Sequence, residues 1–250
     1  MLRVLFVTSQ VTYVPRNYED LFKEFFKHIQ DVEVAGLILL NNLDLNLVKS
    51  VAGLKYLGAD KVQRTLCKNI FALPLKKRER IFKKRKIEVK SFKTMNDQGA
   101  IDWVHAKNID IIINVRTRCI YKNEILQAPK LGCINIHHGI LPKYRGTMCD
   151  LYALSENRGA GFTIHQMNKK IDDGVIFRAV EVSGGEHQDY IDYLQIGASI
   201  EGEELAKLMN DVAKSGRFPK GIKNSSKEKV YTKNPTRDQV KQFKKNGMIL

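Results

Sequence analysis

The chain has 250 residues, of which 43% are hydrophobic and 28% are charged, a composition typical of a globular protein with a substantial core. Its apolar runs are far shorter than the roughly 20 residues that span a bilayer, and no secretory cleavage site follows its first residues, so we expect a cytoplasmic protein without a membrane partner. A formal net charge of +15 favours partners that carry phosphate but does not choose among them.

The first two-thirds of the chain alternate apolar, β-rich runs with amphipathic stretches. Such alternation predicts βαβ units, and therefore a mostly parallel sheet with helices on both faces. The expected strands are 2–8, 32–40, 109–115 and 132–137, and the expected helices are about 17–29 and 122–127.

A strongly basic segment lies between the second and third of these strands. Residues 75–86 read Leu-Lys-Lys-Arg-Glu-Arg-Ile-Phe-Lys-Lys-Arg-Lys. A solvated, basic helix face is the first interpretation, because charge runs usually face solvent. A contact surface for a phosphate-rich partner is the alternative.

The chain changes character after Glu181. A helix is expected at 200–214, followed by a lysine-rich tail. The region is too short for most independent second domains. We therefore divide the chain into a catalytic domain at 1–182 and a C-terminal helical and basic extension at 183–250, packed on the domain or trailing from it.

The four cysteines, Cys67, Cys119, Cys133 and Cys149, stand singly in the sequence. No C-x-x-C spacing occurs, so the pattern indicates neither a zinc site nor a disulfide framework. We expect reduced, packed thiols and no metal.

Chemistry is concentrated first in the segment 131–146, Leu-Gly-Cys-Ile-Asn-Ile-His-His-Gly-Ile-Leu-Pro-Lys-Tyr-Arg-Gly. Asn135 and His137 are two residues apart on a predicted strand, so their side chains share one face. Open α/β sheets bind ligands at the carboxyl ends of such strands. An amide that donates N–H and an imidazole that moves a proton suit a carbonyl reaction. His138 is expected on the opposite side, as a packing or surface residue.

A second segment, 161–176, carries His165 and the run Asp172-Asp173-Gly174. Taken alone, Asp-Asp-Gly is typical of a turn. We expect His165 to lie either beside the site formed by Asn135 and His137 or outside it.

Together the two segments resemble the folate-dependent formyltransferases. The shared motifs, in order and approximate spacing, are Asn135-x-His137, Leu141-Pro142, Arg145-Gly146, Thr163-x-His165 and Asp172-x-Gly174. The resemblance is clear over 109–180, weaker back to Met1 and not visible beyond Val182. It implies a Rossmann-like formyltransferase fold, N10-formyltetrahydrofolate as the formyl donor, and a catalytic triad of Asn135, His137 and Asp172.

In this family the pterin is held largely by backbone groups of two loops. The resemblance therefore implies that cofactor contacts come from Arg116, Thr117, Arg118, Cys119, Ile120, Leu141, Lys169, Lys170 and Ile171. Two departures stand out: Arg116 to Arg118 replace smaller or apolar residues, and Gly139 occupies a place where many members have serine. Because of these departures, the folate pocket could be altered or folate binding could be lost.

The triad implies a mechanism in which Asn135 and a protonated His137 stabilise the oxyanion of a tetrahedral intermediate. Asp172 would support the imidazolium and raise the pKa of His137 above its reference of about 6.5.

We infer the acceptor of the formyl group mainly by excluding other substrates of the family. A methionyl-tRNA enzyme would need a further nucleic-acid-binding domain, and a glycinamide ribonucleotide enzyme a Gly-rich loop after the first strand. We therefore favour a small phosphorylated amine, most simply a nucleotide-linked amino sugar, held by Arg16, Lys143, Tyr144 and Arg145 through charge-assisted phosphate contacts. The alternatives are a methionyl-tRNA formyltransferase-like enzyme, a formyltetrahydrofolate hydrolase, and a basic nucleic-acid-binding protein on an inactive scaffold.

Overall fold

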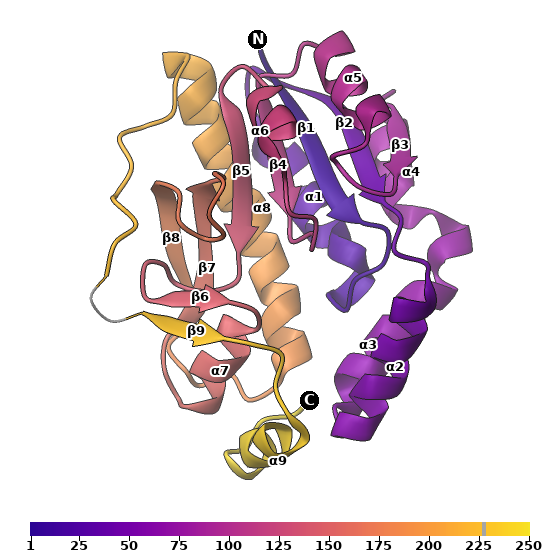
Figure 1. Ribbon diagram of the computed structural model, residues 1–250, viewed down its shortest axis with the longest axis vertical. Helices are drawn as coiled ribbons and strands as arrows, with labels where there is room; N and C mark the ends of the chain where they lie inside the picture. The colour runs from indigo at the N-terminus through magenta and orange to yellow at the C-terminus, as the bar shows by residue number, and fades with distance from the viewer. Residues whose placement is uncertain (227–228) are drawn as a thin grey trace.

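The computed structural model describes residues 1–226 and 229–250, and a twisted sheet forms the centre of this part of the chain (Figure 1). Within these residues the sheet has seven strands in the order β3-β2-β1-β4-β5-β7-β8. The first five are mutually parallel, and β7 is antiparallel to both neighbours. The bounds are β1 Leu2–Ser9, β2 Val32–Leu40, β3 Val89–Phe92, β4 Ile111–Val115, β5 Gly132–His137, β7 Ala160–Gln166 and β8 Ile176–Ser183. The predicted mostly parallel α/β fold is confirmed.

Helices and a small second sheet complete the architecture. The helices are α1 Glu19–His28, α2 Leu45–Leu57, α3 Asp60–Phe71, α4 Lys77–Lys83, α5 Gln98–Ala106, α6 Asn123–Gln127, α7 Cys149–Ser155, α8 Tyr190–Ser215 and α9 Arg237–Lys245, with short 3-10 turns at Pro15–Tyr18 and Leu73–Leu75. The short strands β6 Tyr144–Gly146 and β9 Val230–Thr232 pair in parallel. No helix of the described residues is both long and apolar enough to cross a membrane.

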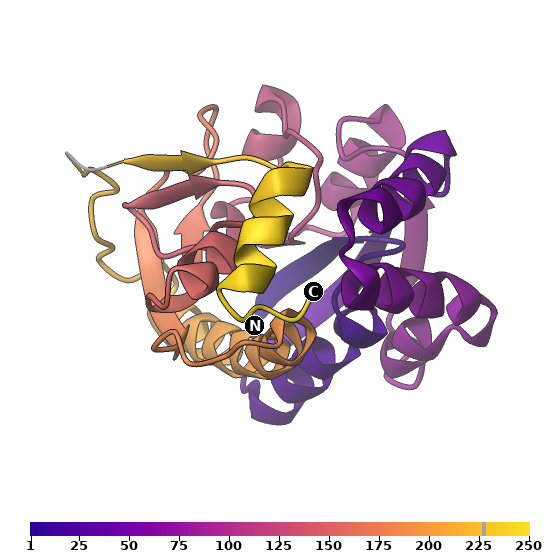
Figure 2. The same ribbon diagram turned by 90° about the horizontal axis from the view of Figure 1, so that it is seen from below.

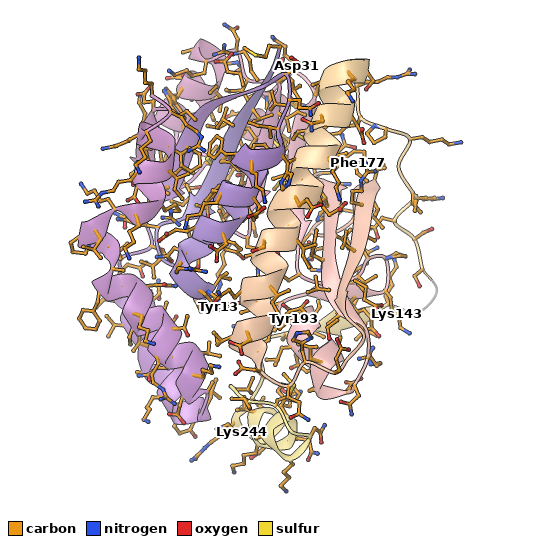
Figure 3. All side chains as sticks on the ribbon, turned by 180° about the vertical axis from the view of Figure 1, so that it is seen from behind. Tyr13, Asp31, Lys143, Phe177, Tyr193 and Lys244 are labelled. Carbon is orange, nitrogen blue, oxygen red and sulfur yellow. The ribbon has the colours of Figure 1, made fainter. Side chains whose placement is uncertain are left out.

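The sheet is buried on both faces because its strands are apolar on both sides. Val4 and Phe6 of β1 belong to one hydrophobic core, whereas Leu5 and Val7 belong to the other, as expected for side chains that alternate along a strand. The first core lies under α1 and α8, which cover the face seen in Figure 3. The second lies under α5 and α6.

The long helix α8 is part of this domain. It begins at Tyr190, ten residues before the predicted start, and Asp189 caps it by accepting hydrogen bonds from the amides of Ile191 and Asp192. Gly202 lets α8 approach α1 closely, because a Cβ at this position would lie 2.2 Å from the carbonyl oxygen of Leu21. Since α8 shares the first core, the residues after Val182 pack on the sheet rather than trail from it.

The basic segment 75–86 is only partly a solvated face. Its lysines are exposed, but Arg78 is 3% exposed and donates hydrogen bonds to the carbonyl oxygens of Ser9, Gln10 and Asn17. Phe82 is fully buried against the rings of α1. These two side chains therefore anchor α4, while the exposed lysines form the solvated basic face; Arg78 alone of the basic residues is buried beneath it.

The C-terminal residues run back across the molecule. Strand β9 lies beside β6, and α9 lies between α7 on one side and the α2–α3 pair on the other (Figure 2). The backbone amide of Lys61 donates a hydrogen bond to Leu250, 2.8 Å away, and that of Tyr190 donates one to Ile249. Segments far apart in sequence thus meet at this end of the domain.

Candidate active site

A cavity of about 380 Å³ opens at the carboxyl ends of β4 and β5. This is the edge at which open α/β sheets bind ligands, and the volume lies within the usual range of small-molecule pockets. The lining comes from both strand ends, the loops 116–121 and 167–172, and the segments 12–14 and 146–148. Asn135, His137 and Asp172 all line it.

His137 and Asp172 face one another in this cavity. The Nδ1 atom of His137 lies 3.5 Å from a carboxylate oxygen of Asp172, and both residues are less than 10% exposed. On the other side of the ring, Nε2 lies 3.0 Å from the carbonyl oxygen of Tyr144. A carbonyl oxygen only accepts, so Nε2 carries the ring proton and Nδ1 is free to take up a second one.

Asn135 is held by two neighbours that the sequence did not single out as its partners. The Nδ2 group of Asn114 donates a hydrogen bond to Oδ1 of Asn135 at 2.8 Å, and Nδ2 of Asn135 lies 3.3 Å from Nε2 of His165. The other nitrogen of His165 lies 2.8 Å from the carbonyl oxygen of Gln166 and donates to it, which leaves Nε2 as the acceptor. One N–H of the Asn135 amide is thereby fixed, and the second can point into the cavity.

Burial lowers the pKa of His137, and the nearby Asp172 carboxylate only partly offsets this effect. The expected rise in the pKa of His137 was therefore wrong, since desolvation of the charged ring outweighs attraction to one carboxylate. Burial and the proximity of His137 also lower the pKa of His165. Both rings are consequently neutral at neutral pH.

Hydrogen bonds from Gly146, Arg145 and Asn224 hold the loop that carries Asp172. The backbone of Asp172 is left-handed, with φ of +51°, and its carboxylate accepts a hydrogen bond from the amide of Gly146 at 3.2 Å. Its carbonyl oxygen accepts from Arg145 and from Nδ2 of Asn224, the latter at 3.0 Å. Arg145 also donates to Asp173 and to Asn224.

None of the four residues expected to hold acceptor phosphate lines the cavity. Arg145 is 1% exposed and uses its guanidinium on the Asp172 loop, so its assignment as a phosphate contact was wrong. Arg16 is ion-paired with Asp20 outside the cavity. Tyr144 is buried with Arg158 over its ring, and Lys143 is exposed beside it.

Replacing Arg145 by methionine is expected to lower the free energy of unfolding by about 1–3 kcal/mol. The reason is that the carbonyl oxygens of Asp172 and Asn224 would lose a buried donor. Denaturant unfolding measures the change, and Lys143→Met, an exposed control just before β6, is expected to shift the free energy of unfolding by no more than about 0.5 kcal/mol. Equal stability of both variants would contradict the structural role of Arg145.

Arg116 does not fill the cavity, although it is a large side chain in a loop that usually has smaller ones. Its guanidinium bonds to His138 and, at 2.8 Å, to the hydroxyl oxygen of Tyr13. His138 contacts Asp150 at 3.1 Å and Glu201 of α8 at 2.5 Å. Burial and Arg116 oppose protonation of His138, but the two carboxylates outweigh them and raise its pKa. His138 is therefore a buried residue rather than a surface one.

The remaining predicted cofactor residues divide into two groups. Leu141 is buried outside the lining, where its amide donates to Thr163, so it was misplaced as a cofactor contact. The others line the cavity: Arg116, Thr117, Arg118, Cys119, Ile120, Lys169, Lys170 and Ile171. At Gly139, a Cβ would lie 2.7 Å from Nε2 of His137 and 2.8 Å from Cβ of Cys149. Glycine therefore leaves room for the imidazole in its observed position.

A Rossmann-like sheet with an amide, an imidazole and a carboxylate in one cavity at its carboxyl edge suits chemistry at a carbonyl carbon. Residues 57–205 match the profile of the formyl transferase family, and the chain belongs to that family. The match extends into α8, beyond the point where the sequence motifs end.

Known relatives agree with this assignment. The chain is 35% identical over 154 residues to methionyl-tRNA formyltransferase of Ehrlichia chaffeensis. The aligned region covers 61% of this chain and 49% of the relative. The chain thus spans about half the length of the curated relatives it matches. In fold it resembles phosphoribosylglycinamide formyltransferase of Anaplasma phagocytophilum, with a TM-score of 0.59 and 16% identity over 93% of this chain and 99% of that one. It also resembles WlaRD, a sugar 3N-formyltransferase solved with dTDP and 5-N-formyl-THF, with a TM-score of 0.51 and 18% identity over 93% and 69% of the two chains.

Proposed function

We propose that this enzyme transfers the formyl group of N10-formyltetrahydrofolate to the primary amine of a small acceptor. The observation that carries the proposal is the cavity in which Asn135, His137 and Asp172 meet the two loops expected to hold the pterin. The reaction breaks the bond between the formyl carbon and N10 and forms one to the acceptor nitrogen. One proton passes from that nitrogen to N10.

The cavity residues suit a folate. Loops 116–120 and 169–171 both line it, and we infer that their backbone groups bind the polar edge of a pterin. The guanidinium of Arg116 is engaged by His138 and Tyr13. When bound, the folate supplies an activated formyl group.

Each catalytic side chain has one task in this proposal. Asn135 donates its second N–H to the formyl oxygen as that oxygen gains negative charge. Neutral His137 accepts a proton from the acceptor nitrogen at Nδ1 and returns it to the departing nitrogen. Asp172, 3.5 Å from Nδ1, stabilises the ring while it is charged.

A nucleotide-linked amino sugar remains our proposed acceptor, and methionyl-tRNA is the second candidate. The sugar is supported by the likeness in fold to WlaRD, which is a sugar 3N-formyltransferase. The tRNA is supported by the identity shared with methionyl-tRNA formyltransferases. The phosphates of either acceptor would need contacts other than Lys143 and Arg145, since neither side chain lines the cavity.

The test begins with binding and proceeds to turnover. Tetrahydrofolate at 100 times its Kd is expected to stabilise the protein by about 2.7 kcal/mol in a thermal-shift assay. Incubation with the formyl donor and either a panel of amino-sugar nucleotides or methionyl-tRNA, followed by mass spectrometry, identifies the acceptor. Formate release without any amine would instead indicate a hydrolase. Absence of folate stabilisation would contradict the proposal.

The pH dependence of kcat/KM follows from the lowered pKa of His137. Only the neutral ring can accept a proton, so activity is expected to fall as the pH drops through a pKa below about 6.5. A pH profile of kcat/KM measures this acid limb. Because only the neutral amine attacks, acceptors with different amine pKa values are expected to move a second ionisation on the acid side of the profile and to leave the ionisation of His137 unchanged. An ionisation above pH 6.5 that stayed the same for every acceptor would be inconsistent with a neutral, buried His137.

A further inference from the structure

The segment that follows α8 crosses the edge of the sheet and reaches the loop that carries Asp172. Residues 217–226 leave the end of α8 and run past the edge strand β8 on their way towards β9 (Figure 1). The family profile matches residues 57–205, so this segment lies outside the matched region. None of its residues has a part in the mechanism proposed above.

Two contacts fix the segment to the beginning of β8. The ring of Phe218 stacks on that of Phe177, with the ring centres 4.4 Å apart. Further along, Ile222 and Ile176 exchange two backbone hydrogen bonds, of 2.8 and 3.0 Å. The backbone is therefore held in place two residues before Asn224.

Asn224 is a buried polar residue in an otherwise exposed stretch. It is 8% exposed, whereas Lys223 and Ser225 on either side of it are exposed. Its Nδ2 group donates to two carbonyl oxygens, those of Asp172 and Gly174, each at 3.0 Å. Burial of an amide is unfavourable unless its donors find such acceptors. The side chain is thus matched to the turn formed by residues 172–174.

The oxygens of Asn224 hold a second donor to the same turn. Oδ1 accepts a hydrogen bond from Arg145 at 2.8 Å, and the backbone carbonyl oxygen of Asn224 accepts one from the same guanidinium at 3.1 Å. Arg145 in turn donates to the carbonyl oxygen of Asp172. Loss of the Asn224 side chain would therefore weaken both donors to this oxygen.

The turn that Asn224 holds has an unusual backbone. Asp172 has a φ of +51°, a left-handed conformation that persists only where the surroundings enforce it. Its carboxylate lies 3.5 Å from Nδ1 of His137, and the backbone conformation sets the direction in which a side chain points. The hydrogen bonds of Asn224 to the carbonyl oxygens on either side of Asp173 therefore help to direct the carboxylate at the imidazole.

We propose that Asn224 is a positioning residue for formyl transfer, which keeps the carboxylate of Asp172 beside the His137 ring by fixing the backbone of residues 172–174. This inference rests on the proposed function. It gives a role in the reaction to a segment beyond the region that the family profile matches.

Asn224→Leu removes both donors and keeps the approximate size of the side chain. It is expected to lower kcat about 10- to 100-fold, because a carboxylate displaced by about 1 Å supports the charged imidazole less well. In an Asp172→Asn enzyme the same substitution is expected to change kcat by less than about twofold, since the charge through which Asn224 acts is already absent.

Asn210→Leu is the matched control. Asn210 also joins distant segments, because it accepts from the amide of Gln30 and donates to the carbonyl oxygen of His28. It lies outside the cavity lining. Wild-type kcat is expected for this variant, which separates the positioning effect from a general loss of a tertiary contact.

NMR titration of the His137 imidazole gives a readout that needs no turnover. The titratable and charged groups near this ring are the carboxylates of Asp172 and Asp150, the rings of His138 and His165, the thiol of Cys149 and the guanidinium of Arg116. Of these, only Asp172 belongs to the turn that Asn224 holds, and its carboxylate raises the pKa of His137 against the effect of burial. The pKa of His137 is therefore expected to be lower in Asn224→Leu than in the wild type, and unchanged in Asn210→Leu. The signal is identified by its absence from His137→Ala.

An unchanged pKa of His137 in Asn224→Leu would overturn the inference, and so would an equal loss of kcat in the wild-type and Asp172→Asn backgrounds. Asn224→Ala removes the same donors and takes the place of Asn224→Leu if leucine prevents folding. In the wild-type protein, the side-chain amide protons of Asn224 are expected to exchange slowly with solvent. Rapid exchange would overturn the inference without any variant.

Failure of the proposed function gives a different result. The wild-type enzyme would then transfer no formyl group to any amine tested. The comparison of His137 pKa values would still decide whether Asn224 positions the carboxylate of Asp172.

Discussion

Replacing His137 by alanine is expected to lower kcat for formyl transfer by about 100- to 10,000-fold, the usual contribution of a positioned acid–base group. The Nδ1 atom of His137 lies 3.5 Å from Asp172, and His137 lines the cavity. Removing the imidazole leaves His165 as the other ring near Asp172, but its Nε2 atom accepts a hydrogen bond from Asn135. Single-turnover measurement with saturating donor isolates this step from binding.

The control for this variant is His105→Ala. His105 is exposed on α5 and outside the cavity lining, so its removal is expected to leave kcat unchanged. Tetrahydrofolate binding is expected to persist in both proteins, which verifies folding. A His137→Ala enzyme that retains more than a tenth of wild-type kcat would exclude His137 as the proton carrier.

Asp172→Asn is the second large effect, with an expected loss of at least about 100-fold in kcat. The amide keeps the size of the carboxylate but loses the charge that stabilises a protonated His137 3.5 Å away. Its backbone contacts with Arg145 and Asn224 do not depend on that charge. The effect is therefore expected in kcat rather than in stability.

Asp173→Asn is the matched control. Asp173 is adjacent in sequence and accepts a hydrogen bond from Arg145 at 3.1 Å, a role that an amide oxygen can fill. Activity close to wild type is expected for this variant. If Asp173→Asn were inactive and Asp172→Asn active, the catalytic acid would have to be reassigned.

Strand periodicity predicted the fold and the shared face of Asn135 and His137, whereas the addition of Asp172 to them was implied by the resemblance to the formyltransferases. Ile134 and Ile136 lie in the core, so Asn135 and His137 between and after them had to share the other face. The partner of Asn135 was also predictable in principle. Asn114 is a polar residue in the apolar run 111–115, and it pairs in register with Asn135.

What the sequence did not predict depends on side-chain direction. Arg145 follows two residues that were treated in the same way, yet it turns inward to the Asp172 loop while Lys143 is exposed. The pKa of His137 depends on burial from several elements, which no single motif reports. Gly139 leaves room for the imidazole of His137, and the guanidinium of Arg116 is held by Tyr13, which is distant in sequence.

The path of the C-terminal residues has a consequence for how the enzyme matures. The strands of the central sheet end at Ser183, but Asn224 donates hydrogen bonds to the carbonyl oxygens of Asp172 and Gly174, and Asn234 lines the active-site cavity. These contacts join residues far apart in the sequence, and such contacts form late in folding because closing long loops costs entropy. We therefore expect the loop that carries Asp172 to become ordered only when the final segment docks.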